Sequence, residues 1–403
     1  MKTRKTMKLA CAALAAVMTM GVVVGCGGNS AKNYAENNTE YVIGASGPLT
    51  GGASVYGVAV RNSAAMAVEE INAAGGLKFA DGSSVNFKFV MMDDAHDATK
   101  VAANYANLYE GGMQVSLGCV TTKPCLEFKG YAKDDNVFSL TPSASGDDVA
   151  KDADNMFQMC FTDSGQGAEA AKFVKETYPD KNVKLGVLYK SGDDYSQGLY
   201  NNFKASLGDD WTMTVASFTD DSEFASQVQT LKDCEFLFMP IYYTPAKNFM
   251  IQAKGKVANS AIYFGCDGFD GIDSIKGFDI TAIPQEVSML SHFNSKATEG
   301  KAKEFVDKYN AKYTSAADAG TLNQFGAAAY DSVYAIYDAM KKAVANGKSI
   351  PANVAPSDLC EILKEVFHSS DFSVTGATGT NIKWNEDGTV NKTAVKYVIK
   401  SAN

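Results

Sequence analysis

The sequence predicts an α/β protein built from two Rossmann-like lobes, each a parallel sheet flanked by helices. From Tyr41 onward, short apolar runs alternate with longer amphipathic segments, a pattern typical of parallel sheets covered by helices on both faces. The alternation occurs in two successive series, and 403 residues are too many for one ordinary core. We therefore expect two similarly built lobes.

The first series begins at Tyr41 and supplies the first sheet. Runs rich in β-branched and aromatic residues mark its strands, and apolar residues three or four apart mark its helices. We expect strands at 41–45, 85–91, 115–117 and 137–140, and helices at 58–74, 98–109 and 125–133.

The second series follows the same order. We expect helices at 165–178, 198–207, 224–231 and 246–254, and strands at 183–189, 212–218, 236–239 and 261–264. Helical patterns at 301–313, 326–345 and 357–367 then return to complete the first lobe, and strands at 382–384 and 395–399, around a turn at 385–388, complete the second. Crossovers near 161, 291 and 373 form a hinge between an N-terminal lobe (41–161 plus 292–373) and a C-terminal lobe (162–291 plus 374–403).

Residues 1–25 resemble a bacterial lipoprotein signal peptide. Basic residues without an acid precede an apolar run from 9 to 24, and the sequence VVGC at 23–26 resembles a lipobox. This resemblance implies cleavage before Cys26, lipidation of its sulfur and an extracytoplasmic position on the bacterial cell membrane. An uncleaved anchor would need about twenty apolar residues, more than this run provides. The polar residues 26–40 predict a lipidated, flexible tether.

Composition narrows the choice of partner. The chain has 46 acidic and 37 basic residues, so nucleic acid and anionic lipid are unfavourable partners. Its two arginines, Arg4 and Arg61, cannot form a multi-arginine clamp for phosphate or a dicarboxylate. A small ligand of low net charge fits better.

The cysteines and histidines indicate neither a metal nor a cofactor. The three histidines, His96, His292 and His368, are far apart in the sequence and lack ligand spacing, so we interpret them as structural or solvated. Six cysteines follow Cys26 without a zinc pattern, and the sequence leaves open whether they form disulfides: Cys119, Cys125, Cys160, Cys234, Cys266 and Cys360.

Catalytic and nucleotide-binding patterns are also missing from the sequence. The glycine-rich segment 44–52 lacks both the Gly-Lys-Ser/Thr ending of a phosphate loop and Gly-x-Gly-x-x-Gly spacing, so we expect a tight loop that brings Tyr56 to a cleft. Ser46 and Ser164 lack the nucleophile elbow of hydrolases. We expect a protein that is not an enzyme.

Hydroxyl-rich segments follow two neighbouring strands. Thr121 and Thr122 come after the strand 115–117, where Thr122 can cap the next helix, and Ser143 and Ser145 follow the strand 137–140. Free amides at a helix start favour a carboxylate, although a plain helix cap is the alternative. Ligands in open parallel sheets bind beyond the carboxyl ends of the strands. We therefore expect these four residues to bind a ligand.

The second series has matching candidates for an amine. Tyr242 follows the strand 236–239, and Asp267 follows the strand 261–264. A carboxylate with nearby tyrosines can receive an ammonium group by ion pairing and cation–π contact. Tyr195 is a further candidate; each of the three is alternatively an ordinary loop residue.

Together, these features resemble the leucine/isoleucine/valine-binding family of type I periplasmic binding proteins, which are Venus-flytrap receptors of ABC importers. The resemblance spans Tyr41 to about Lys400. It rests on eight short motifs: IG at 43–44, PLTG at 48–51, YG at 56–57, AVEEINAAGGL at 67–77, DD at 93–94, TPSA at 141–144, DSGQG at 163–167 and D-x-x-F at 221–224.

The resemblance assigns roles to individual residues. It implies that Thr122 binds a ligand carboxylate, that Ser143 and Ser145 surround the carboxylate and ammonium, and that Tyr242 and Asp267 close over the ammonium. Pocket walls would come from Tyr56, Val120 and Tyr195, and Thr121 is a further candidate ligand-binding residue. Some members have a disulfide where this chain has His96 and Thr121.

The function implied is a monomeric, lipid-anchored substrate-binding protein that captures a branched-chain or other small amino acid by lobe closure and delivers it to an ABC permease. One alternative is a receptor of the same fold for an amide or aromatic acid, or one that signals through a membrane sensor. An extracytoplasmic enzyme is a third hypothesis, for which the sequence offers no recognisable nucleophile. The sequence does not identify the ligand.

Overall fold

The computed structural model describes residues 33–315 and 321–402. The predicted signal peptide and the lipidation site Cys26 lie outside the described residues. The tether prediction is wrong for residues 33–40, because this segment packs on the first lobe. Ala35 is fully buried, and Asn38 Nδ2 donates hydrogen bonds to Gly112 O at 2.8 Å and to Gln114 Oε1 at 3.1 Å.

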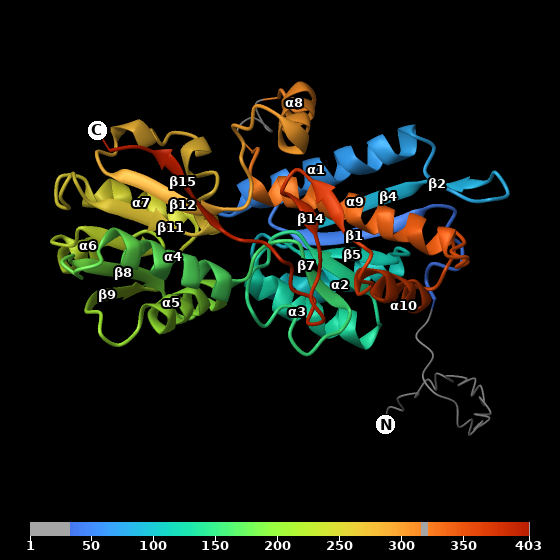
Figure 1. Ribbon diagram of the computed structural model, residues 1–403, viewed down its shortest axis with the longest axis horizontal. Helices are drawn as coiled ribbons and strands as arrows, with labels where there is room; N and C mark the ends of the chain where they lie inside the picture. Colours follow the sequence, from blue (N-terminus) through green and yellow to red (C-terminus); the bar gives the residue numbers. More distant parts are fainter. Residues whose placement is uncertain (1–32, 316–320, 403) are drawn as a thin grey trace, which may run out of the picture. The chain divides into compact units, whose positions relative to one another are not determined.

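The first lobe contains a wholly parallel sheet in the order β4-β1-β5-β6-β7 (Figure 1). Its strands are β1 (Tyr41–Gly47), β4 (Phe87–Asp93), β5 (Val115–Cys119), β6 (Phe138–Thr141) and β7 (Met156–Gln158), and a small hairpin, β2 (Leu77–Lys78) with β3 (Ser84–Val85), precedes β4. Strands β1, β5 and β6 are fully buried, as a sheet covered on both faces requires, whereas in the edge strand β4 only Phe87 is buried.

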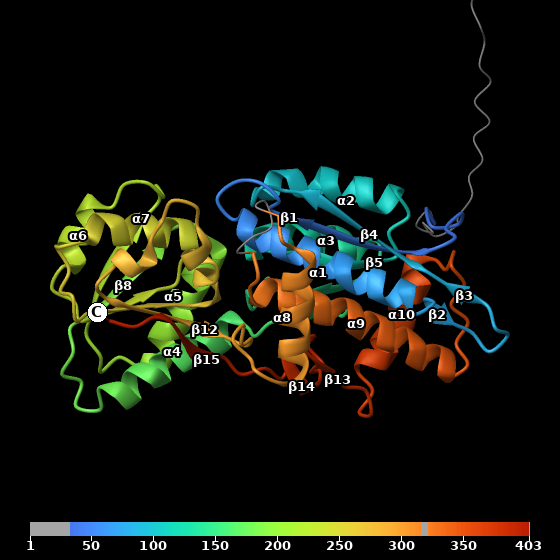
Figure 2. The ribbon, with the colours of Figure 1, turned by 90° about the horizontal axis from the view of Figure 1, so that it is seen from above.

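Helices cover both faces of this sheet (Figure 2). Those of one face share a core with Tyr41, Ile43 and Ala45: α1 (Ser54–Ala73), α9 (Gln324–Ala345) and α10 (Pro356–Phe367). Those of the other face are α2 (Val101–Glu110), preceded by η1 (Ala98–Lys100), and α3 (Thr122–Asp134). Helix α8 (Gly300–Lys312) packs on α1 and α9 through a smaller core, so the three late helices complete the first lobe as predicted.

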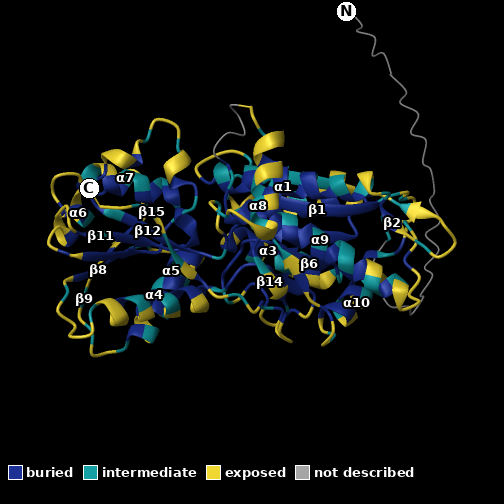
Figure 3. Cartoon of the chain, turned by 45° about the horizontal axis from the view of Figure 1, so that its top comes forward, coloured by how far each residue is buried: buried dark blue, intermediate teal, exposed yellow. Residues whose placement is uncertain are grey.

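The second lobe has a sheet in the order β15-β12-β11-β10-β8-β9, parallel except for β15. Its strands are β8 (Leu185–Lys190), β9 (Met213–Phe218), β10 (Phe236–Met239), β11 (Ile262–Gly265), β12 (Glu286–Ser291) and β15 (Val395–Lys400). Helices α4 (Asp163–Thr177) and α5 (Asp194–Leu207) share one core with it, and α6 (Ala225–Leu231) and α7 (Tyr243–Ala253) another. Short 3₁₀ turns are η2 (Asp267–Phe269), η3 (Ile272–Ser274) and η4 (Ile280–Ala282). Figure 3 shows the inner strands of both sheets largely buried, whereas the edge strands β4, β9 and β15 are mostly half-buried or exposed.

The chain crosses between the sheets after β7, after β12 and before β15. The first two crossovers lie where the sequence places them, but the third does not. The segment 382–384 was expected in the second sheet; instead β13 (Val374–Gly376) and β14 (Gly379–Ile382) form a separate hairpin in the core of the first lobe. Trp384 anchors this segment, since its indole N–H donates to Gln158 O at 2.8 Å. The third crossover therefore lies between Val390 and Val395, rather than near 373.

The two lobes also share a core. Tyr56, Val120 and Phe325 of the first lobe pack in one cluster with residues of the second, such as Ile241 and Phe269. In residues 33–315 and 321–402, no helix combines the length and apolar character needed to cross a membrane.

Candidate functional site

The hydroxyl residues predicted to bind a carboxylate lie together at the carboxyl ends of β5 and β6, which are neighbours in the sheet. Ser143 Oγ donates to Val120 O at 2.7 Å, and Gly146 N donates to Thr122 Oγ1 at 3.2 Å. Thr121, Thr122, Ser143 and Ser145 are all buried. These hydrogen bonds hold the turn after β5 against the turn after β6, and the hydroxyl residues of both turns are buried.

The predicted capping role of Thr122 is wrong. Thr121 is the N-cap residue of α3, and no side-chain cap bond is formed there. The Thr121 hydroxyl instead lies 2.9 Å from Nδ1 of His96. His96, which we interpreted as structural or solvated, therefore contacts a predicted ligand residue, and its ring also meets Tyr242 edge-on at 5.1 Å between centroids. His96 and Thr121 are therefore joined by a hydrogen bond.

The second-lobe candidates also lie together. The Tyr195 hydroxyl donates to Asp267 Oδ1 at 2.6 Å and accepts from Gly268 N at 2.9 Å. The ring of Tyr195 stacks on Tyr242, with centroids 4.5 Å apart and planes 12° from parallel. The backbone N–H of Asp267 donates to Gln166 Oε1 at 2.9 Å. The backbone of Asp267 is thus held by α4, and its carboxylate is held by α5.

Tyr56 joins the two lobes directly. Its hydroxyl donates to Gly268 O of the second lobe and accepts from Tyr243 N at 3.3 Å. Its ring packs against Phe325, with centroids 4.4 Å apart. Tyr56, a candidate binding residue of the first lobe, therefore contacts the second lobe beside the candidates Tyr242 and Asp267.

Several buried polar atoms in this region make no close hydrogen bond among the described residues: Ser145 Oγ, both carboxylate oxygens of Asp163, and Gln166 Nε2. The Ser145 hydroxyl is nonetheless near enough to Asp163 to oppose the rise that burial causes in the pKa of its carboxyl. Asp163 and Ser145 are adjacent, because Asp163 N donates to Ser145 O at 2.8 Å. Gln166 in turn holds the backbone of Asp267. An unpartnered buried polar group costs free energy, so such groups normally meet a ligand or water. The unsatisfied atoms extend from the first-lobe hydroxyls to the second-lobe carboxylate.

Asp163 is a candidate site residue that the sequence analysis did not select. The segment 163–167 contributed to the family resemblance, and Asp163 opens a helix directly after the first crossover. Its position at the interface depends on how the lobes pack, which its local sequence does not encode.

The electrostatics favour a cation on the second-lobe side. Burial raises the pKa of Asp267 to about 6 and raises the pKa of Asp163 well above its ordinary value, with the neighbouring Asp267 charge adding to the shift. Burial also raises the pKa of Asp193. Each buried carboxylate is destabilised in its ionised form, and a ligand ammonium would relieve that cost.

The sequence pattern of the family described as periplasmic binding protein matches residues 40–402. The chain belongs to this family. This periplasmic binding protein is 27% identical over 323 residues to the leucine-, isoleucine-, valine-, threonine- and alanine-binding protein of Pseudomonas aeruginosa, a match that covers 78% of this chain and 80% of that protein. The family is one of solute-binding proteins, and the resemblance inferred from the sequence is confirmed.

Solved structures agree with the predicted α/β fold. The branched-chain amino acid binding protein LivJ of Streptococcus pneumoniae, in complex with isoleucine, is similar with a TM-score of 0.73 and 25% identity over 90% of this chain and 99% of that one. The leucine-binding protein LivK of Thermotoga maritima has a TM-score of 0.74 and 23% identity, with 89% and 95% covered. The fold prediction is therefore confirmed.

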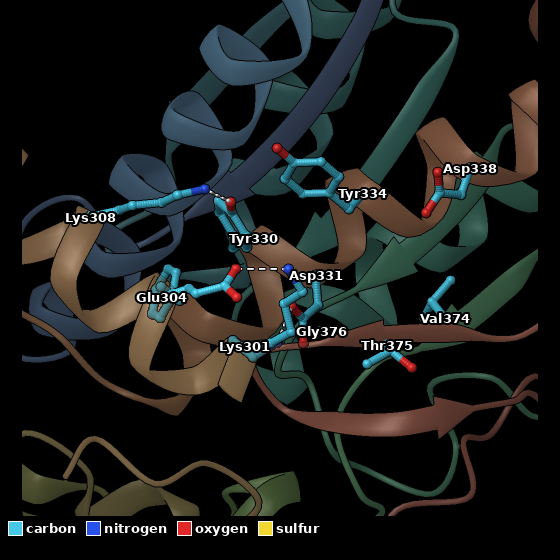
Figure 4. A pocket seen from close by; sticks show the side chains of 12 residues that line it. Lys301, Glu304, Lys308, Tyr330, Asp331, Tyr334, Asp338, Val374, Thr375 and Gly376 are labelled. Atoms are coloured by element: carbon cyan, nitrogen blue, oxygen red, sulfur yellow. Dashed lines mark hydrogen bonds and ion pairs between the residues drawn. The ribbon is translucent and has the colours of Figure 1, made fainter. Parts of the chain in front are cut away.

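The binding protein has another cavity, of about 170 Å³, between α8, α9 and β13 (Figure 4). Its charged groups are already partnered. Lys301 pairs with Glu304 at 2.7 Å, and Lys308 pairs with Glu70 at 2.8 Å. The Asp331 carboxylate accepts hydrogen bonds from the backbone and hydroxyl of the segment 377–378. This cavity therefore makes no comparable demand for a ligand.

The six cysteines of residues 33–315 and 321–402 are free and buried. None of the predicted ligand-binding residues is tethered by a disulfide in this part of the chain.

Proposed function

We propose that the protein is an extracytoplasmic substrate-binding lipoprotein that captures a branched-chain or other small amino acid and delivers it to an ABC permease. The observation that carries the proposal is the set of buried, unpartnered polar atoms that spans both lobes. A zwitterion supplies an acceptor and a donor at opposite ends, which matches hydroxyls and amides on one lobe and carboxylates on the other.

The carboxylate end would lie at Thr121 and Thr122. The first backbone N–H groups of α3 point toward this end, and the positive end of the helix dipole stabilises an anion there. Ser143 and Ser145, after the next strand, supply hydroxyls within the same enclosure. Arginine is not required for such a site.

The ammonium end would lie between Asp163 and Asp267, with Ser145 beside Asp163. A charge-assisted hydrogen bond from an ammonium is about twice as strong as a neutral one. Tyr195 fixes one oxygen of Asp267, and Tyr242 stacks on Tyr195 to form a wall. Tyr56 and Val120 would contribute the opposite wall.

Binding would work by population shift. Because the two ends of the ligand contact different lobes, the ligand gains its second set of contacts only when the lobes close. Converting a mostly open protein to a mostly closed one takes about 5 kcal/mol of differential binding. The Tyr56–Gly268 contact would form in the same closure.

The remaining elements of the proposal concern organisation and location. The lobes would comprise 41–161 plus 292–390 and 162–291 plus 391–402, hinged at the crossovers. The chain would be a monomer, exported by residues 1–25, anchored in the bacterial cell membrane through lipid on Cys26 and partnered by an ABC permease. Palmitate labelling in a bacterial host, lost in Cys26→Ala, tests the anchor.

A thermal-shift screen of the purified protein against the twenty L-amino acids tests the binding function. We expect at least one to raise the melting temperature, because a ligand at a hundredfold excess over its Kd adds about 2.7 kcal/mol of stability. Asp267→Asn should remove this response, and the exposed Asp180→Asn should retain it. A protein that responds to no amino acid would refute the proposed function.

A further inference from the structure

A cavity of about 130 Å³ adjoins the proposed site and is lined by both lobes. His96 contributes from the first lobe, and Tyr242, Lys190 and Asp193 contribute from the second. The volume is enough for a side chain of a few heavy atoms, since one water needs only about 10–15 Å³ measured in this way.

The cavity lies beside the proposed site, and Tyr242 is common to both. Tyr242 lines the cavity and stacks on Tyr195, whose hydroxyl binds Asp267. His96 lines the cavity and lies 2.9 Å from Thr121 Oγ1, at the proposed carboxylate end. A ligand held at both ends would have its side chain directed toward the cavity that His96 and Tyr242 line.

We propose that this cavity receives the ligand's side chain and selects a neutral polar one, carrying a carboxamide or hydroxyl, over an aliphatic one. This inference rests on the proposed function. The cavity offers hydrogen-bonding groups of both kinds: carboxylates from Asp193 and Asp221, the ammonium of Lys190 and the imidazole of His96.

The charges of the cavity argue for a neutral partner. Lys190 Nζ already pairs with Asp221 Oδ1 at 2.8 Å. Asp193 accepts a hydrogen bond from Ser196 N at 2.9 Å and keeps capacity for another donor. Burial lowers the pKa of His96, so its ring is neutral at pH 7 and can donate or accept. A ligand charge would disturb this arrangement, whereas a carboxamide satisfies both a donor and an acceptor.

An aliphatic side chain would be disfavoured for the converse reason. It would take the water away from Asp193, Lys190 and His96 without replacing the lost hydrogen bonds. The loss would fall mainly on Asp193, which is buried, because a buried polar group that is left unpaired costs free energy.

Isothermal titration calorimetry with two matched pairs, asparagine against leucine and threonine against valine, tests the inference. The members of each pair have nearly the same shape, so polarity alone differs. We expect the polar member to bind at least tenfold more tightly in both pairs. In Asp193→Ala the preference should fall below threefold, and the exposed Asp180→Asn should retain it.

A second variant, Lys190→Met, keeps the test valid if Asp193→Ala does not fold, and circular dichroism verifies the fold of each. Leucine or valine binding as tightly as its polar counterpart would overturn the inference while leaving the proposed function intact. A preference unchanged in both folded variants would overturn the assignment of the cavity. Binding of no amino acid in the wider screen would refute the proposed function itself.

Discussion

Replacing Asp267 by asparagine should separate its role in binding from its role in stability. The side chain is 3% exposed, and its Oδ1 accepts a hydrogen bond from Tyr195. Asparagine keeps the shape and can still accept that bond, but it cannot offer a charge to an ammonium. The substitution therefore removes one interaction with little change in packing.

The loss in affinity follows from the strength of that interaction. Hydrogen bonds to charged groups contribute about 1.5–3 kcal/mol. Asp267→Asn should accordingly weaken amino-acid binding by roughly 10- to 150-fold.

The effect on the unliganded protein should have the opposite sign. Burial raises the folded-state pKa of Asp267 to about 6, above its ordinary value of 3.8. Between these values the folded state binds more protons than the unfolded state, so stability falls as pH rises through this window. A rise in pKa from 3.8 to about 6 corresponds to a loss of about 3 kcal/mol of folding stability at pH 7.5. Asp267→Asn removes this penalty and should raise the melting temperature of the unliganded protein by several degrees.

Calorimetric titration and differential scanning calorimetry at pH 7.5 measure the two effects on the same samples. We expect weaker binding together with higher unliganded stability, and neither change in Asp180→Asn. Unchanged affinity would remove Asp267 from the site. Weaker binding together with lower unliganded stability would show that the carboxylate supports the fold rather than the ligand.

The remaining predictions concern the same site. Asp163→Asn should weaken amino-acid binding at least tenfold, with an unchanged circular dichroism spectrum; normal affinity would show that another group satisfies this carboxylate. Tyr56→Phe removes the hydroxyl that donates to Gly268 O and should weaken binding about fivefold, because such a hydrogen bond contributes about 1 kcal/mol. At equal ligand concentration, small-angle scattering should show a smaller fraction of closed molecules than in the wild type. Identical scattering curves would contradict a role for Tyr56 in closure. The affinity of the wild type for its amino acid should fall as pH decreases through about 6, because Asp267 must be ionised to hold an ammonium. Asp267→Asn should lack this pH dependence. Identical pH profiles of affinity for the two proteins would show that Asp267 does not titrate in this range.

Features of the fold that depend on local pattern could be predicted from the sequence. The strands of both sheets are apolar runs that alternate with amphipathic helices, and this period is visible in the residues themselves. Asp267 and Ser143 were selected as candidates for a related reason, because polar residues placed directly after such strands lie at the edge where ligands bind in open parallel sheets.

Features that depend on tertiary packing could not be predicted in this way. A short strand does not encode which sheet it joins, and the segment around Trp384 lies in the first lobe because Phe367 and Gln158 receive its ring and its N–H. The contact between His96 and Thr121 joins residues 25 apart in the sequence, so no spacing pattern indicated it. The buried position of Asp163 likewise depends on both lobes.

A crystal structure with the amino acid that binds best in the screen is the most direct test of the central claim, that the interlobe site holds a zwitterion by opposite ends. We predict the ligand carboxylate against Thr121, Thr122 and the start of α3, and the ammonium within hydrogen-bonding distance of Asp163 or Asp267. A ligand bound elsewhere, or one whose ammonium faces α3, would contradict this account.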